Sequence, residues 1–78
     1  MKSMTCRDLG GACDLAFEAE TFEEMKELSK KHGMEMFAKG DEAHLAAAAA
    51  VKDMMTGPQA FREWLASKQK HFDSLPDL

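Results

Sequence analysis

The sequence predicts an α+β fold, mostly α, in which an N-terminal β-hairpin packs against three helices. Near the start, apolar residues recur at every second position around a turn-rich segment. Beyond it they recur at the three- and four-residue spacing of amphipathic helices. Gly40–Asp41 and Gly57–Pro58 divide this second part. We expect one domain spanning residues 1–78, with a hairpin over 1–20 and helices over 21–39, 41–56 and 58–74, the last two forming a helical hairpin.

The predicted hairpin surrounds the segment from Asp8 to Ala12, which contains an aspartate and the two glycines typical of a turn. Apolar side chains alternate on either side of it, at Met4, Cys6, Cys13, Leu15, Phe17 and Ala19. Because side chains alternate between the two faces of a strand, this register puts both cysteines on the inward face with Leu15 and Phe17. Cys6 and Cys13 should therefore lie near one another.

The first predicted helix begins with a capping box, in which the Thr21 hydroxyl caps the helix and Glu24 follows three residues later. Its apolar stripe consists of Phe22, Met25, Leu28, His32 and Met36. His32 is thus expected on the core side. Gly33 and Gly40 are both candidate ends of this helix.

Asp41 is the expected N-cap of the second helix, and Pro58 suits the first turn of the third. The second helix has the stripe His44, Ala47, Ala48, Val51, Met54 and Met55, and its run of five alanines buries little surface. The third has the bulkiest apolar side, made of Phe61, Trp64, Leu65, Lys68, Phe72 and Leu75.

Composition excludes several classes of function. The net charge is −4, and acidic and basic residues are interleaved, whereas a protein that binds nucleic acid usually has a basic face. The longest apolar run, Leu45–Val51, is far shorter than the roughly 20 residues of a membrane span. No apolar signal core follows Met1–Cys6, so we expect a cytoplasmic protein with reduced thiols and no membrane partner.

The sequence does not predict an enzyme. Its carboxylates fall on the solvated sides of the predicted helices, which leaves no inward pair for acid–base catalysis. It also lacks the G-x-S-x-G, phosphate-loop and H-E-x-x-H motifs.

Cys6, Cys13 and His32 are candidate metal ligands. Thiolate sulfur and imidazole nitrogen brought together by a hairpin and a helix are typical of structural zinc sites, which need four ligands. Six residues separate the cysteines and eighteen separate Cys13 from His32, so the spacing differs from the short C-x(2–4)-C motif. The fourth ligand is left open between Glu18, His44 and water.

Other interpretations of these residues remain. The cysteines could form a disulfide or redox pair, or could be small buried residues beside a hydrogen-bonded core histidine. The alternative function is a helical interaction module. It would form a homodimer, or bind another protein, through the face formed by Phe61, Trp64, Leu65 and Phe72.

One stretch, M-K-x-M-T-C-R-D-L-G-G-A-C-D, is followed by an aromatic strand, T-x-E-E and a histidine. This pattern, from about Lys2 to Phe37, resembles the small predicted metal-binding proteins of the domain of unknown function 1059 family. The resemblance implies a zinc-finger-like hairpin–helix unit in which two cysteines pair with two histidines near the end of the helix. Cys6, Cys13 and His32 match three of these positions, whereas Phe37 stands where the second histidine is expected. The resemblance leaves the physiological role open.

Overall fold

Two short strands and three longer helices make up the chain in the computed structural model, which describes residues 1–78. The elements in order are strand β1 (Lys2–Thr5), the 3₁₀ helix η1 (Arg7–Leu9), strand β2 (Ala16–Ala19), and helices α1 (Phe22–Ala38), α2 (Glu42–Met54) and α3 (Pro58–Ser74). The strands pair antiparallel, and the hairpin packs against α1. The predicted α+β fold, mostly α, is confirmed.

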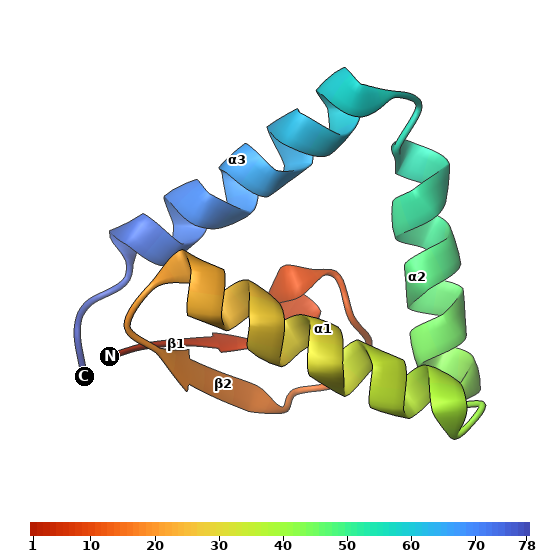
Figure 1. Ribbon diagram of the computed structural model, residues 1–78, viewed down its shortest axis with the longest axis horizontal. Helices are drawn as coiled ribbons and strands as arrows, with labels where there is room; N and C mark the ends of the chain where they lie inside the picture. The colour runs from red at the N-terminus through yellow and green to blue at the C-terminus, as the bar shows by residue number, and fades with distance from the viewer.

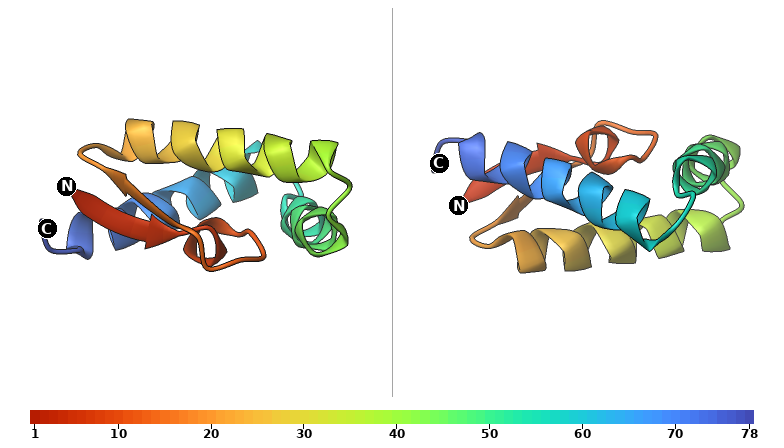
Figure 2. Two further views of the ribbon diagram at one scale, coloured as in Figure 1. Left: turned by 90° about the horizontal axis from the view of Figure 1, so that it is seen from below. Right: turned by 90° about the horizontal axis from the view of Figure 1, so that it is seen from above.

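The three helices lie along the sides of a triangle, with the hairpin beneath α1 (Figure 1). Seen edge-on, α1 and the hairpin form two layers, and α2 is viewed nearly down its axis at one end of the molecule, on the same side of α1 as the hairpin (Figure 2). Helices α2 and α3 diverge from their connecting turn instead of packing side by side, and α3 returns to contact β1. None of the helices combines the length and apolarity needed to cross a membrane.

The apolar core lies at the end of the molecule where α3 meets the hairpin. Its buried members come from the hairpin, the loop after β1, the start of α1 and the end of α3: Met4, Cys6, Phe17, Ala19, Phe22, Met25 and Phe72. The rings of Phe22 and Phe72 lie 5.8 Å apart, and Lys2 Nζ lies 5.0 Å from the Phe72 ring centre. Helix α2 contributes no apolar side chain to this core.

The hairpin is shorter than its apolar pattern predicts. Met4 pairs with Phe17 and Thr5 with Ala16, and residues 6–15 form a long loop rather than continuing the strands. The expectation that Leu15 points inward is wrong, because its side chain is 49% exposed. Leu15 precedes β2 in irregular backbone, where the alternation of a strand no longer fixes the direction of a side chain.

Helix α1 begins as predicted, with Thr21 Oγ1 accepting a hydrogen bond from the Glu24 backbone at 3.2 Å. It continues through Gly33 and ends before Gly40, which has a positive φ of 71°. There the N–H of Gly40 bonds to the Phe37 carbonyl and that of Asp41 to the Met36 carbonyl, both at 3.0 Å, which is a Schellman motif. This turn sets where α2 begins.

Three residues of the predicted helical stripes are exposed, namely Leu28, Met54 and, on α3, Phe61. Leu28 is exposed because Ser29, rather than Leu28, continues the inward row of α1 between Met25 and His32. Met54 is exposed at the end of α2, where the helix projects beyond α1. The other predicted stripe positions of α2 are buried or half-buried.

We expect Phe72→Ala to lower the free energy of unfolding by about 3 kcal/mol, because it removes a buried ring that joins α3 to the hairpin core. Phe61→Ala, at a ring that is 43% exposed on the same helix, should cost less than about 1 kcal/mol. Urea unfolding followed by circular dichroism measures both values. Equal losses would contradict the docking of α3 through Phe72.

Candidate metal centre

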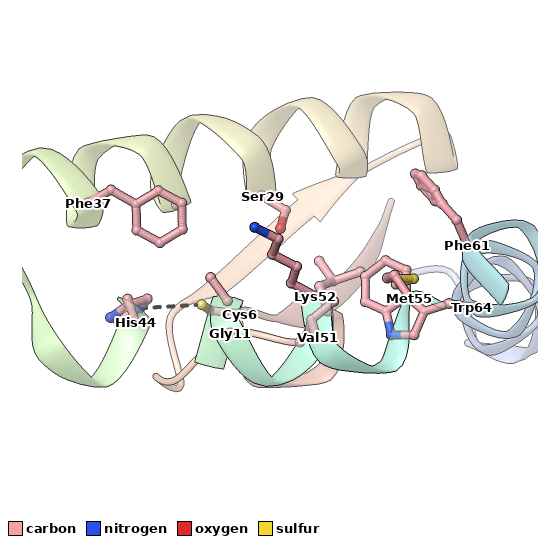
Figure 3. A pocket seen from close by; sticks show the side chains of 14 residues that line it. Cys6, Gly11, Ser29, Phe37, His44, Val51, Lys52, Met55, Phe61 and Trp64 are labelled. Atoms are coloured by element: carbon pink, nitrogen blue, oxygen red, sulfur yellow. Dashed lines mark hydrogen bonds between the residues drawn. The ribbon is translucent and has the colours of Figure 1, made fainter. Parts of the chain in front are cut away.

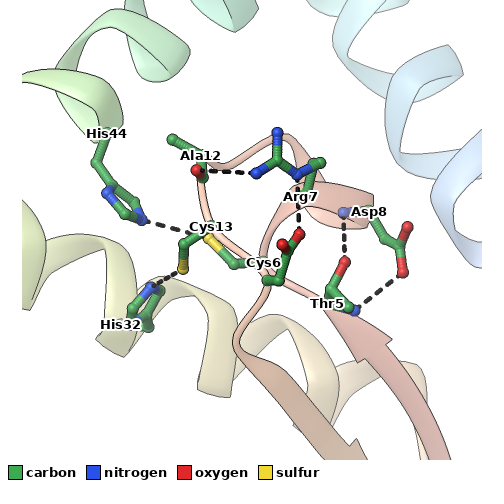
Figure 4. A network of polar contacts seen from close by, with 9 residues as sticks. Thr5, Cys6, Arg7, Asp8, Ala12, Cys13, His32 and His44 are labelled. Carbon is green, nitrogen blue, oxygen red and sulfur yellow. Dashed lines mark hydrogen bonds and ion pairs between the residues drawn. The ribbon is translucent and has the colours of Figure 1, made fainter.

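The loop after β1 is held in shape by its own hydrogen bonds. The Thr5 N–H donates to Asp8 Oδ2 and the Asp8 N–H donates to Thr5 Oγ1, each at 3.0 Å, a reciprocal pair of bonds across the start of η1 (Figure 4). The bond from the Thr5 N–H is the main cause that lowers the pKa of Asp8. Across the loop, the N–H of Cys6 bonds to the Leu15 carbonyl and that of Arg7 to the Cys13 carbonyl. These bonds fix the backbone at both cysteines.

Gly11 permits a close approach to the Cys6 sulfur. A Cβ atom at residue 11 would lie 2.1 Å from Cys6 Sγ and 3.0 Å from the Cys6 carbonyl oxygen. The Gly11 N–H donates to that same carbonyl at 2.8 Å. Only a residue without a side chain fits here, so the second glycine of the loop is required by the position of the thiol.

His32 reaches the loop from the middle of α1. Its Nε2 lies 3.3 Å from Cys13 Sγ, and its ring packs edge-on against Phe17 with the centres 5.6 Å apart. The predicted inward direction of His32 is confirmed, since the residue is 9% exposed.

His44 reaches the same place from the first turn of α2. Asp41 caps α2 by accepting from the His44 N–H at 2.9 Å, and the same carboxylate oxygen contacts His44 Nδ1 at 2.5 Å. The opposite ring nitrogen, Nε2, therefore points to Cys6 Sγ at 3.6 Å. A carboxylate that binds one nitrogen of an imidazole and directs the other is the usual support of a metal-ligating histidine.

The four side chains converge on one point. The two sulfurs and one nitrogen from each ring lie within 4.8 Å of one another, and three of the four residues are buried. In a tetrahedral zinc site, bonds of about 2.3 Å to sulfur and about 2.05 Å to nitrogen put neighbouring sulfur and nitrogen atoms about 3.6 Å apart. The observed sulfur–nitrogen distances of 3.6 and 3.3 Å are close to this value. The donor set thus fits a four-coordinate metal ion.

The electrostatics of the two free thiols differ. Burial is the main cause that raises the pKa of Cys6 above its ordinary value. The Leu15 backbone N–H is the main cause that lowers the pKa of Cys13, and His44 adds to the effect. The Asp41 carboxylate in turn raises the pKa of His44, chiefly through their hydrogen bond, and the His44 ring lowers that of Asp41. The cluster therefore favours negative charge on the Cys13 sulfur.

The structure brings together all three ligands predicted from sequence and adds His44, one of the three candidates for the fourth position. Glu18 is not in the cluster, because it is exposed on β2 opposite Ser3. Phe37 stands near the end of α1 and has no donor atom. The signals for His44 were its inward place on the α2 stripe and the preceding cap residue, Asp41.

The chain matches no protein-family model, no curated protein and no solved structure. The resemblance to the domain of unknown function 1059 family stays a prediction.

We expect Gly11→Ala and Gly33→Ala to change stability in opposite directions. The first should lower the free energy of unfolding by more than about 2 kcal/mol, because its methyl group overlaps the Cys6 sulfur. The second should raise it by about 0.5–1 kcal/mol, because an alanine there favours the helix and meets only Phe37 Cζ, at 4.0 Å. Thermal and urea unfolding measure both, and a neutral Gly11→Ala would contradict the tight placement of Cys6.

Proposed function

We propose that this chain is a small, non-enzymatic metal-binding protein in which Cys6, Cys13, His32 and His44 hold one structural zinc ion. The observation that carries the proposal is the convergence of two sulfurs and two ring nitrogens from three separate segments within 4.8 Å. Zinc is the metal that this donor set suits best, because Cys₂His₂ is a common set in its tetrahedral structural sites.

A structural role follows from the number of ligands. Catalytic zinc sites keep a coordination position open for water or substrate, whereas four protein ligands fill a tetrahedral ion completely. The ligands also join the η1 loop and the middle of α1 to the start of α2, a helix that contributes no apolar side chain to the core. Zinc would hold together the part of the molecule that apolar packing does not, and its binding energy would add to folding.

The alternative of a Cys6–Cys13 disulfide or redox pair stays a prediction. Both cysteines are free, and their sulfurs would have to approach to about 2.05 Å. A disulfide would also give no reason for two histidines, one of them directed by Asp41, to face the sulfurs. An interaction role for the α3 face stays a prediction too, although Phe72, at 4% exposed, belongs to the core and not to the available surface.

Protein expressed without a tag and purified without chelator should contain about one zinc ion per chain by plasma mass spectrometry. Both thiols should react with a thiol reagent only after the metal is removed, since a bound thiolate is protected. Removing the metal should also lower the melting temperature, because the site connects three segments. Two unreactive thiols without metal would instead indicate the disulfide.

Variants define the ligands in the same measurement. His44→Ala should reduce the zinc content at equal protein, because it removes the proposed fourth ligand. Glu18→Gln, at the sequence candidate that lies outside the cluster, should retain full content. Zinc retained in His44→Ala and lost in Glu18→Gln would overturn the assignment of ligands.

We expect the zinc to leave as the pH falls below about 6, because imidazole and thiolate must lose their protons to bind a metal ion. Release should accompany proton uptake and should be reversed by returning to neutral pH. A coloured zinc indicator in a pH titration measures it. Full retention down to pH 4 would contradict ligation by the two histidines.

A further inference from the structure

A pocket of about 470 Å³ adjoins the metal centre, in the space that the three helices and the η1 loop enclose. Cys6 and His44 lie at one end of it, and Met55, Phe61 and Trp64 lie at the other (Figure 3). Small-molecule sites in proteins usually have volumes of about 300–1,000 Å³ and mainly apolar walls with a few polar groups. This pocket has both properties.

The walls are apolar because α2 and α3 leave large side chains without a partner here. Val51 and Met55 face the pocket from α2, and Phe61 and Trp64 face it from α3. Trp64 also covers the loop, since a Cβ at Gly10 would lie 3.0 Å from its ring. The alanines of α2 are too small to fill the space between these residues.

Lys52 is the only formally charged residue that lines the pocket. Its side chain extends from α2 over the space between the two ends (Figure 3). It takes part in none of the ion pairs of the structure. Its helical neighbours at three and four residues are Ala48, Ala49, Met55 and Thr56, so no carboxylate on α2 is placed to pair with it.

We propose that this pocket binds an amphipathic monocarboxylate, with its apolar body against Trp64, Val51 and Met55 and its carboxylate at the Lys52 ammonium. The Ser29 hydroxyl, on the α1 wall, is a further hydrogen-bond donor for the carboxylate. The charge of Lys52 selects this class of ligand. An apolar helix of a second copy, laid on the same surface, would cover the ammonium and leave it without a partner, which is costly.

This inference goes beyond the metal proposal, because the ligand touches the walls and not the ion. The metal centre forms one end of the pocket through Cys6 and His44, and it would keep that wall in place. Zinc content is therefore measured on the sample used for binding. If a chain that contains no zinc binds octanoate, only the metal proposal is contradicted. If a chain that contains zinc does not bind octanoate, only the pocket proposal is contradicted.

Octanoate is the probe, and 1-octanol is its uncharged counterpart of the same length. Trp64 is the only tryptophan and the chain has no tyrosine, so intrinsic fluorescence reports on the pocket directly. We expect saturable changes in Trp64 fluorescence with octanoate, at one ligand per chain, and about fivefold weaker binding of octanol. The preference for octanoate should decrease with added salt, as for any partly exposed ion pair.

Three variants test the proposed position of the ligand in the pocket. Lys52→Met keeps the apolar stem but removes the charge, so it should weaken octanoate about fivefold and leave octanol unchanged. Lys70→Met, on α3 outside the pocket, is the matched control and should leave both unchanged. Ala48→Phe fills the pocket and should abolish binding of both probes, with zinc content and circular dichroism showing that the chain still folds.

The proposal is overturned by equal affinity for octanoate and octanol, or by equal effects of Lys52→Met and Lys70→Met. It is also overturned if neither probe gives a saturable response. Sedimentation at the same concentration then shows whether the chain is a dimer, since a second copy that covers the pocket would explain the lack of a response to either probe.

Discussion

The convergence of Cys6, Cys13, His32 and His44 is the constraint on which the arrangement of this chain depends. The apolar core joins the hairpin to α1 and α3 at one end, but α2 contributes no apolar side chain to it. The start of α2 meets the rest of the molecule through His44, which contacts Cys6 Sγ and packs edge-on against the His32 ring. Cys6 belongs to both parts, since it is a core residue and a member of the cluster. A small chain with so limited a core commonly relies on a metal ion or a similar link.

Much of the fold could be predicted from local patterns. The Thr21 cap, the Asp41 cap and the start of α3 at Pro58 follow from single residues that suit those positions, and each lies where it was expected. The direction of His32 followed from helical spacing. Leu15 was misplaced because a strand pattern was extended into a loop, whose backbone is set by the Thr5–Asp8 bonds and by Gly11 rather than by alternation.

The fourth ligand could not be selected from sequence, because it depends on the angle between two helices. That angle is set by the Gly40 turn, whose hydrogen bonds decide where α2 begins and which residue of its first turn faces the loop. His44 was one of three candidates until this geometry was known. The pocket could not be predicted from the sequence either, because it arises from the wide angle between α2 and α3 together with the small side chains of the alanine run.

The two ends of the chain lie side by side, where the Leu78 N–H bonds to the Met1 carbonyl at 2.6 Å (Figure 1). They lie at the end of the molecule away from α2. A short linker could therefore join them, and new termini could be opened in the exposed turn between α2 and α3 without cutting any segment that carries a ligand. Such a circular permutant would keep all four ligand positions in the same order along the chain, but all four would follow α3 instead of preceding it.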